Sequence, residues 1–471
     1  MNEGNVKHKY GSLLKSHPDV KEQSEKYPMT YPAAWWADSA NQRYKKLPDT
    51  FDGRDIWEAY IQFPSDQKSS ESWAIVATDI LADRYTIITA GQINLFLSFT
   101  EVIACINPPQ HLNLANLDSP YIDATQGYSI YDAWEYIYKY GVPETNCFSR
   151  RKLKNALKKV YPNDSKKQML PSELTYTEKQ DIYGKKCSNI EGNQLFCLTM
   201  QDNKPIARRT FFCDGIFNIK EDNLQETVAN IKYEILRFGP VAAGFVIYEN
   251  FANIYDGISI YTGPNTGDKP LGGHYVSIIG WGNTDKGKIV SEYWICRNSW
   301  GTNWGLLGFF KIQIGIVQCQ LEDNVSACAP FYHHLNKNQY MANDGYFKGK
   351  QVDITDMEMY NPELVKKRAI FDIDETNFYP KKAVEMIKKG ELYGDLDPLI
   401  LFPKDLPNLK YYWAENFRNF KVITEEQNQY GDGDGDDSGS SVFYYIIISI
   451  LFIGCFYTGY TAFSQKAVPK T

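Results

Sequence analysis

Three short stretches of the sequence contain residue types that together can do nucleophilic chemistry. They are DQKSSESWAIVAT at 66–78, GGHYVSIIGWG at 272–282 and NSWGTNWGLLGFF at 298–310. An imidazole can take the proton of a nucleophile and return one to a leaving amine, while an amide carbonyl holds that imidazole in one tautomer. A nucleophile at a helix N-terminus has its anion favoured by the helix dipole. The stretches offer a hydroxyl, an imidazole and an amide for such a site.

Helices must position the first of these stretches. The run from Ser72 has apolar residues at the i, i+3, i+4, i+7 and i+8 spacing of an amphipathic helix, with serines ahead of it that can cap the first turn. A second helix is predicted over 129–140, stopped by Gly141, and a third from Asn223 to the Gly239-Pro240 break. The apolar face of the first helix comprises Trp73, Val76, Ala77, Ile80 and Leu81.

Strands must position the other two stretches. After Pro240 the sequence changes to short apolar and aromatic runs, VAAGFVI, HYVSIIGWG, EYWIC and GFFKIQI, which are separated by Gly, Asn and Asp turns. Such runs are typical of an antiparallel sheet or barrel. Helices followed by strands predict an α+β fold of two lobes, with a site expected in the cleft between them.

The three stretches, in this order, resemble the papain-like cysteine peptidases, and within them the cathepsin B branch. LPDTFDGRDIW at 47–57 looks like the start of the mature domain, so the resemblance spans about 47–330, roughly 60% of the chain. It implies a papain-like fold with a helical left lobe and a β-barrel-like right lobe. It also implies a peptidase that holds polypeptide in its cleft and needs no cofactor or metal.

The resemblance also implies roles for individual residues. His274 corresponds to the base, Asn298 to the residue that orients it, and Trp300 to a shield over their hydrogen bond. Gln67 corresponds to the side-chain oxyanion donor, and Ser72, directly before Trp73, stands at the nucleophile position.

The sequence departs from the family at that nucleophile. The family pattern has Cys before the Trp, whereas this chain has Ser72, in a segment one residue shorter and without the companion Cys. A thiol with a pKa of about 8.5 can become a resident thiolate, which an alkoxide cannot. The hydroxyl is also shorter, so base and oxyanion donors would need repositioning. We therefore expect Ser72 to be a poor nucleophile.

Two further departures concern loops. The cathepsin B branch trims dipeptides with a His-bearing occluding loop, but 112–273 contains no His, so this exopeptidase activity is not expected. Ser72 and His274 are 202 residues apart, against about 130 to 150 in papain-like chains. The excess lies mainly in the Lys- and Arg-rich segment 143–213, which we interpret as a solvated surface insertion rather than a partner-binding loop.

Composition and cysteine usage limit the function classes. A formal charge of −7 without a long basic block gives no electrostatic footprint for nucleic acid. Eight of the nine cysteines lie outside the apolar C-terminal stretch, so disulfides are plausible, but 105 pairings are possible. No Cys/His spacing predicts zinc.

The C-terminal region lies outside the resemblance. The 22 uncharged residues 442–463 are long enough to cross a bilayer, so we predict a transmembrane helix that makes the protein a single-pass membrane protein. The Asp-Gly-Asp-Gly-Asp-Asp run at 432–437 lacks the Glu that completes a calcium loop and is interpreted as a solvated linker. The phosphatase-like Asp372 and Asp374 of 372–376 are interpreted as a chance match, because too few residues follow.

The orientation of that helix stays open. Lys466 and Lys470 after it, with aspartates before it, favour a cytosolic C-terminus. The N-terminus shows no apolar core of a secretory leader, which instead suits a tail-anchored or viral protein with a cytosolic body.

The expected domains follow the chain. They are a pro-like segment 1–46, a papain-like domain 47–330, an appended segment 331–430, a linker 431–441, the membrane helix 442–463 and a tail 464–471.

We expect a weak or inactive peptidase homologue that binds polypeptide in its cleft. The alternative is an active endopeptidase that hydrolyses peptide bonds by acyl transfer.

Overall fold

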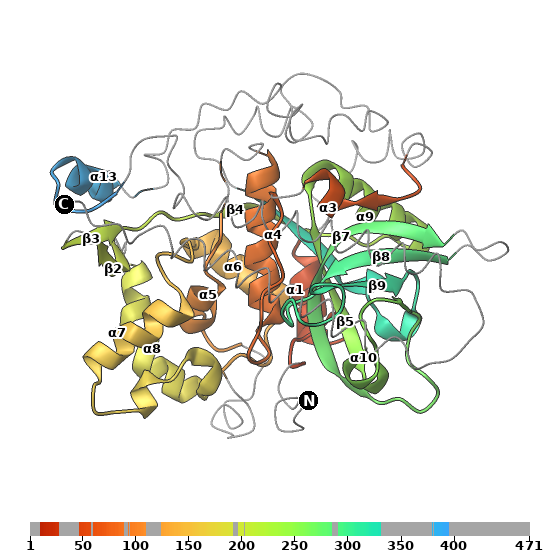
Figure 1. Cartoon of the computed structure of the whole chain (residues 1–471), viewed down its shortest axis with the longest axis horizontal. Coiled ribbons are helices and arrows are strands. Elements are labelled where there is room, and N and C mark those ends of the chain that lie inside the picture. Colours follow the sequence, from red (N-terminus) through yellow and green to blue (C-terminus); the bar gives the residue numbers. More distant parts are fainter. Residues whose placement is uncertain are drawn as a thin grey trace, which may run out of the picture. The chain divides into compact units, whose positions relative to one another are not determined.

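The helical lobe is organised around one long buried helix. The structure is a computed structural model that describes residues 10–27, 47–57, 60–88, 93, 95–109, 124–191, 196–201, 203–284, 291–330, 379 and 381–394. Helix α4 (Ser72–Ile88) contains the predicted helix and packs against α5 (Phe99–Cys105) and α6 (Ile130–Tyr140). Figure 1 shows α4 standing between these helices and the sheet.

The predicted helix boundaries are confirmed by capping contacts. Ser129 accepts a hydrogen bond from the Asp132 N–H and forms a capping box at the start of α6, while Gly141, at φ 67°, ends it. Helix α9 (Leu224–Phe238) is capped by Asn223, which accepts from the Glu226 N–H, and stops at Gly239. Both helices therefore begin and end where the sequence indicates.

The second lobe is a sheet in the order β4-β10-β5-β7-β8-β9-β6, with β1 pairing on β7. All pairs are antiparallel except β6 with β9. Helix α9 packs on β5 and β7, and α4 contacts β5, β7 and β10 from the other lobe. The predicted antiparallel strands are confirmed, and the two lobes meet along α4. The strands are β1 (Phe51–Asp52), β4 (Cys213–Asn218), β5 (Val241–Tyr248), β6 (Ile260–Tyr261), β7 (Pro270–Thr284), β8 (Ser291–Arg297), β9 (Phe309–Gln313) and β10 (Val325–Pro330).

The insertion at 143–213 folds with its own apolar core, so it is more than a solvated loop. Helices α7 (Arg150–Val160) and α8 (Tyr176–Glu191) turn Leu153, Leu157 and Tyr183 inward. The disulfide Cys105–Cys187 fastens the insertion to α5, and Cys147–Cys197 joins its start to its own strand β2 (Phe196–Gln201). Four basic residues of α7 are exposed, whereas Arg150 and Lys152 are half-buried; the exposed ones are Arg151, Lys154, Lys158 and Lys159.

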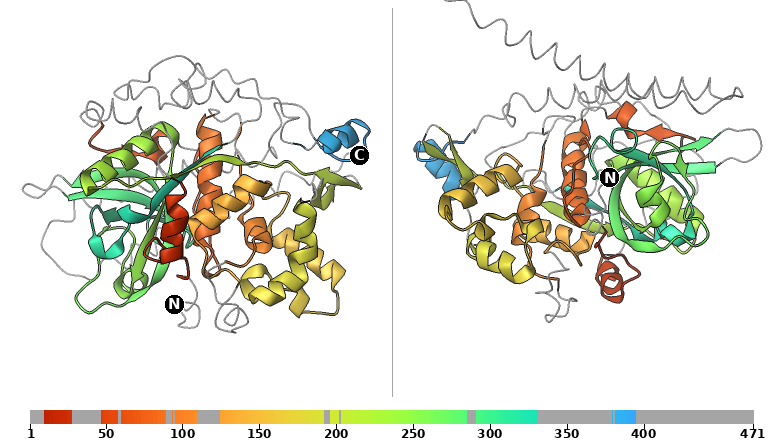
Figure 2. Two further views of the ribbon diagram at one scale, coloured as in Figure 1. Left: turned by 180° about the vertical axis from the view of Figure 1, so that it is seen from behind. Right: turned by 60° about the horizontal axis from the view of Figure 1, so that its bottom comes forward.

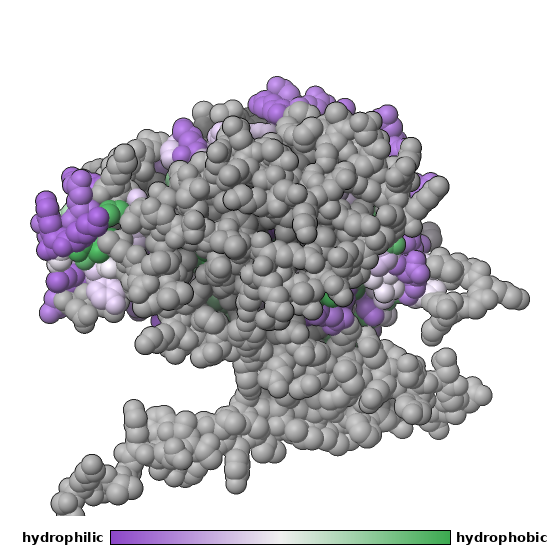
Figure 3. Space-filling view, turned by 90° about the horizontal axis from the view of Figure 1, so that it is seen from above, coloured by the Kyte–Doolittle hydropathy of each residue, from purple (hydrophilic) through white to green (hydrophobic). Residues whose placement is uncertain are grey.

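Residues beyond the papain-like region also contact the insertion. Helix α13 (Lys381–Lys388) packs its Ala383 near Ala207 of β3 (Lys204–Ala207), and the Ala207 N–H donates to the Tyr393 carbonyl at 2.7 Å. In the space-filling view, hydrophilic side chains gather at the left edge, the side on which Figure 1 places α13 and β3 (Figure 3). Part of the appended segment 331–430 is thus docked on the insertion.

No helix among the described residues is long and apolar enough to cross a membrane. The predicted span 442–463 and the Asp372–Asp374 motif lie outside the described residues. The same is true of the whole second compact unit, 416–471.

A buried lysine connects α8 to the end of α5. Lys179 is 1% exposed, and its Nζ donates to the carbonyls of Ile103 and Ile106, at 3.2 and 2.9 Å, and to the Tyr128 hydroxyl at 3.2 Å. It therefore satisfies carbonyls that the end of α5 leaves unpaired. Burial lowers the pKa of Lys179 from 10.5 to about 7.

This lysine should make stability depend on pH. Between about pH 7 and 10.5 the unfolded chain holds the Lys179 proton more tightly than the folded chain, so unfolding takes up a proton and stability rises with pH. We expect the free energy of unfolding of the wild type to rise by about 1 kcal/mol more per pH unit than that of Lys179→Met between pH 7.5 and 9.5. Denaturant unfolding at several pH values measures this slope. The exposed Lys154→Met should keep the wild-type slope, and equal slopes for all three proteins would contradict the assignment.

Candidate active site

Ser72 begins α4 and faces the sheet lobe. The Ser72 Oγ accepts a hydrogen bond from the backbone N–H of Tyr275 at 3.2 Å, and Ser72 is fully buried. Trp73, the next residue, donates from its Nε1 to the Thr125 carbonyl at 2.9 Å and stacks on Tyr128 with ring centroids 4.4 Å apart. The first turn of α4 is thus held from both lobes.

His274 and Asn298 form the pair that the sequence predicts. His274 on β7 lies 2.8 Å from Asn298 through Nε2 and Oδ1. The amide oxygen only accepts, so the bond needs the proton on Nε2 and makes Nδ1 the basic nitrogen of the neutral ring. The Ser299 N–H also donates to Oδ1 at 2.8 Å, which fixes the amide. The Trp300 ring lies 5.2 Å from the imidazole, centroid to centroid, over this pair.

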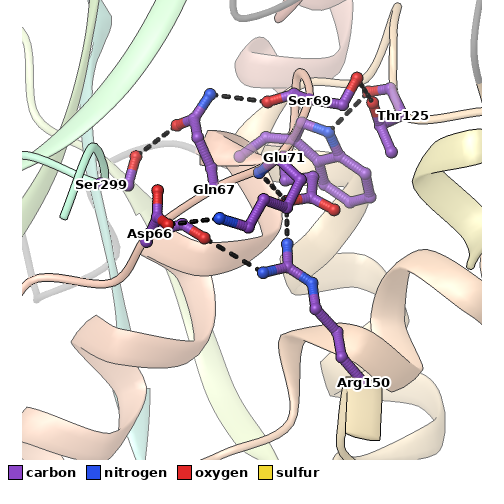
Figure 4. A network of polar contacts seen from close by, with 9 residues as sticks. Asp66, Gln67, Ser69, Glu71, Thr125, Arg150 and Ser299 are labelled. Carbon is purple, nitrogen blue, oxygen red and sulfur yellow. Dashed lines mark hydrogen bonds and ion pairs between the residues drawn. The ribbon is translucent and has the colours of Figure 1, made fainter. Parts of the chain in front are cut away.

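Gln67 is held inside its own loop. Its Nε2 donates to the Ser69 carbonyl at 2.7 Å, and its Oε1 accepts from the Ser299 hydroxyl at 2.5 Å (Figure 4). The Gln67 N–H bonds the Ser299 carbonyl at 2.8 Å. One amide hydrogen of the expected oxyanion donor is therefore committed to a carbonyl of its own loop.

A carboxylate lies directly before Ser72, which the sequence reasoning did not single out. The Glu71 side chain is 2% exposed and accepts from the Lys68 N–H at 2.8 Å and from the Arg150 guanidinium, whose Nη1 also donates to the Asp66 carbonyl (Figure 4). Arg150 belongs to α7, so the insertion reaches the first turn of α4. A negative charge here competes with any anion forming at Ser72 for the positive end of the helix dipole.

The N-terminal segment, which the sequence analysis interprets as pro-like, lies across the site; its contacts there were not predicted. The Ser12 Oγ is 3.1 Å from the Ser72 Oγ, and the Gly11 N–H donates to the Ser70 Oγ at 3.0 Å. The Tyr10 ring lies 5.7 Å from that of Trp300, centroid to centroid.

Backbone hydrogen bonds attach the same segment to both lobes. The Gly127 N–H donates to the Gly11 carbonyl at 2.8 Å, and the Leu13 N–H donates to the Tyr128 carbonyl at 2.9 Å. On the sheet side, the Ser12 N–H donates to the Gly273 carbonyl at 3.2 Å. An extended backbone thus fills the space over Ser72.

Side chains beyond this crossing anchor the segment. Leu14 is 4% exposed and lies where a Cβ on Gly244 or Gly273 would collide with it, at 2.6 and 2.9 Å. Helix α1 (Pro18–Glu25) follows, and Gln23 donates to Glu135 of α6 at 3.1 Å. Seen from behind, α1 lies between the sheet and α6 (Figure 2).

Comparisons with known proteins agree with this fold. Residues 47–329 match the family model of the papain family cysteine proteases. The chain is similar to cathepsin B-like cysteine proteinase 6 of Caenorhabditis elegans, with 28% identity over 64% of this chain and 73% of that protein. It is also similar to cathepsin B-like protease 1 of Arabidopsis thaliana, with 29% identity over 58% of this chain and 59% of that protein.

Among solved structures, procathepsin B S9 of Trypanosoma congolense matches 70% of this chain and 88% of that chain, at 20% identity and a TM-score of 0.46. The family model covers more than half of the sequence and includes all the stretches from which the site is built. The chain belongs to the papain family of cysteine proteases and is cathepsin B-like.

Proposed function

We propose that this protein is a membrane-anchored, papain-fold polypeptide-binding protein with little or no peptidase turnover. The observation that carries the proposal is the extended backbone of residues 11–13, which hydrogen-bonds to Gly127 and Tyr128 on one lobe and Gly273 on the other. Backbone contacts of this kind do not depend on side-chain identity, so they suit a site for polypeptide in general. The membrane attachment rests on the apolar stretch 442–463.

Low turnover follows from the groups around Ser72. A serine needs its proton removed during attack, so the base and the oxyanion donors must both be in place. The Ser72 hydroxyl contacts Ser12 and the Tyr275 N–H, while Gln67 donates to Ser69. Loss of one oxyanion donor typically costs 10² to 10³ in rate. The Glu71 carboxylate, paired with Arg150, occupies the helix terminus that would otherwise stabilise an anion.

A competing proposal is an active endopeptidase that uses Ser72 as nucleophile. The intact His274–Asn298 pair, at 2.8 Å, favours it, because such a pair can serve as a base for acyl transfer. In that case the hydroxyl would attack the scissile carbonyl and His274 would pass its proton to the leaving amine.

Peptidase assays on the full chain separate the two proposals when the wild-type Ser72 reference and every variant also carry Leu14→Asp, because residues 10–14 otherwise fill the cleft. We expect wild type and Ser72→Ala to cleave a mixed fluorogenic peptide library at the same background rate, since the hydroxyl does no chemistry. Ser72→Cys, which restores a thiol, should exceed both. Cleavage by wild type that Ser72→Ala abolishes would overturn the binding proposal and establish the peptidase.

The occupied cleft gives a second prediction. In a Ser72→Cys background, adding Leu14→Asp places a charge in a buried apolar position and should release the segment. We expect a water-soluble thiol reagent to label the introduced thiol about tenfold faster or more, the factor that corresponds to roughly 1.4 kcal/mol of docking energy. Labelling of the chain that keeps Ser72 measures the reaction of the other cysteines, and this background is subtracted.

The matched control is Lys21→Asp in the same background, which changes charge at an exposed position of α1. It should leave the labelling rate unchanged. Equal rates with and without Leu14→Asp would show that residues 10–14 do not shield the site in solution.

A further inference from the structure

The turn after helix α7 contains an acceptor motif for N-linked glycosylation. Asn163-Asp164-Ser165 fits Asn-x-Ser/Thr with x other than Pro. Asn163 and Ser165 are both exposed in the turn between α7 and the short helix η5 (Lys166–Gln168). A surface turn is the position that such a motif needs.

The turn keeps its shape without these two side chains. The Asp164 N–H donates to the Tyr161 carbonyl at 3.2 Å, and Gln168 Nε2 donates to the same carbonyl at 2.7 Å. Ser165 makes no side-chain cap at the start of η5. Among the residues that the structure describes, the Asn163 amide has no hydrogen-bond partner. Both motif side chains point to solvent at no structural cost.

The disulfides of the same insertion indicate a suitable compartment. Cys105–Cys187 ties α8 to α5 in the body of the protein, and Cys147–Cys197 closes a loop within the insertion around this turn. Disulfides form and persist in oxidising environments such as the secretory lumen, where N-linked glycans are also attached. Two independent features of the insertion therefore suit one compartment.

A second copy of the motif provides an internal comparison. Asn324-Val325-Ser326 also fits the pattern, but Asn324 is 2% exposed and Ser326 is fully buried. Asn324 Nδ2 donates to the Gln320 carbonyl and its Oδ1 accepts from the Lys15 N–H, each at 2.7 Å. A glycan on Asn324 is incompatible with this packing, so folded chains must lack it.

We propose that Asn163 is an N-glycosylation site and that Asn324 is not. The donor is an oligosaccharide linked to a lipid diphosphate. The Asn163 Nδ2 bonds to the anomeric carbon as that carbon's bond to the diphosphate oxygen breaks. The lipid diphosphate leaves with the electron pair, and the amide gives up one proton. The glycan would stand at the end of α7, beside Val160, which is 55% exposed.

The test uses the full chain, expressed behind a cleavable leader in cells that glycosylate in the secretory lumen. Removal of the leader verifies that the chain has entered the secretory lumen. We expect an endoglycosidase that removes N-glycans to lower the apparent mass of wild type, with the sugar mapped to the Asn163 peptide by mass spectrometry. Asn163→Gln and Ser165→Ala should lose this shift. Ser165→Thr, which preserves the motif, should keep it.

The buried motif supplies the matched control. Ser326→Ala removes that motif with a change of one hydroxyl and should leave the shift unchanged. A chain with its leader removed and an unmodified Asn163 peptide would overturn the proposal, as would a shift that survives Asn163→Gln. Neither result depends on whether the cleft cleaves peptides.

Discussion

The junction between the first turn of α4 and strand β7 is the constraint on which the site depends. The Tyr275 N–H donates to the Ser72 Oγ, so the residue after His274 is locked to the start of the helix. The same junction fixes the two lobes relative to each other and leaves room for an extended backbone above Ser72. Residues 11–13 occupy this space and form hydrogen bonds to both lobes.

The hydroxyl of Ser72 determines which contacts this junction can make. A hydroxyl hydrogen-bonds well at these distances, and Ser72 does so with Ser12. Gln67 donates to the Ser69 carbonyl, and the Glu71 carboxylate, paired with Arg150, stands where an anion would otherwise benefit from the helix terminus. Each feature stabilises a resting polar network and weakens support for a transition state. The histidine and asparagine remain paired beside it.

Much of the fold was predictable, because its signals are local. The apolar period from Trp73, the cap at Ser129 and the Gly239-Pro240 break each specify an element by short-range physics. The His274–Asn298 pairing was predictable from the family resemblance. Contacts between distant segments were not: Ser12 reaches Ser72 across 60 residues, and Arg150 reaches Glu71 across 79. No composition or period encodes such pairings, and the disulfides Cys105–Cys187 and Cys147–Cys197 were likewise only two of many possibilities.

The central claim is that the cleft binds polypeptide without consuming it. The most direct measurement uses the Leu14→Asp chain and a fluorescent peptide with the sequence of residues 10–17. Fluorescence anisotropy follows binding, and mass spectrometry of the same sample follows the peptide. We predict saturable binding with the peptide recovered intact after prolonged incubation. Absence of binding, or a peptide cut by this chain but not by the same chain with Ser72→Ala, would contradict the account.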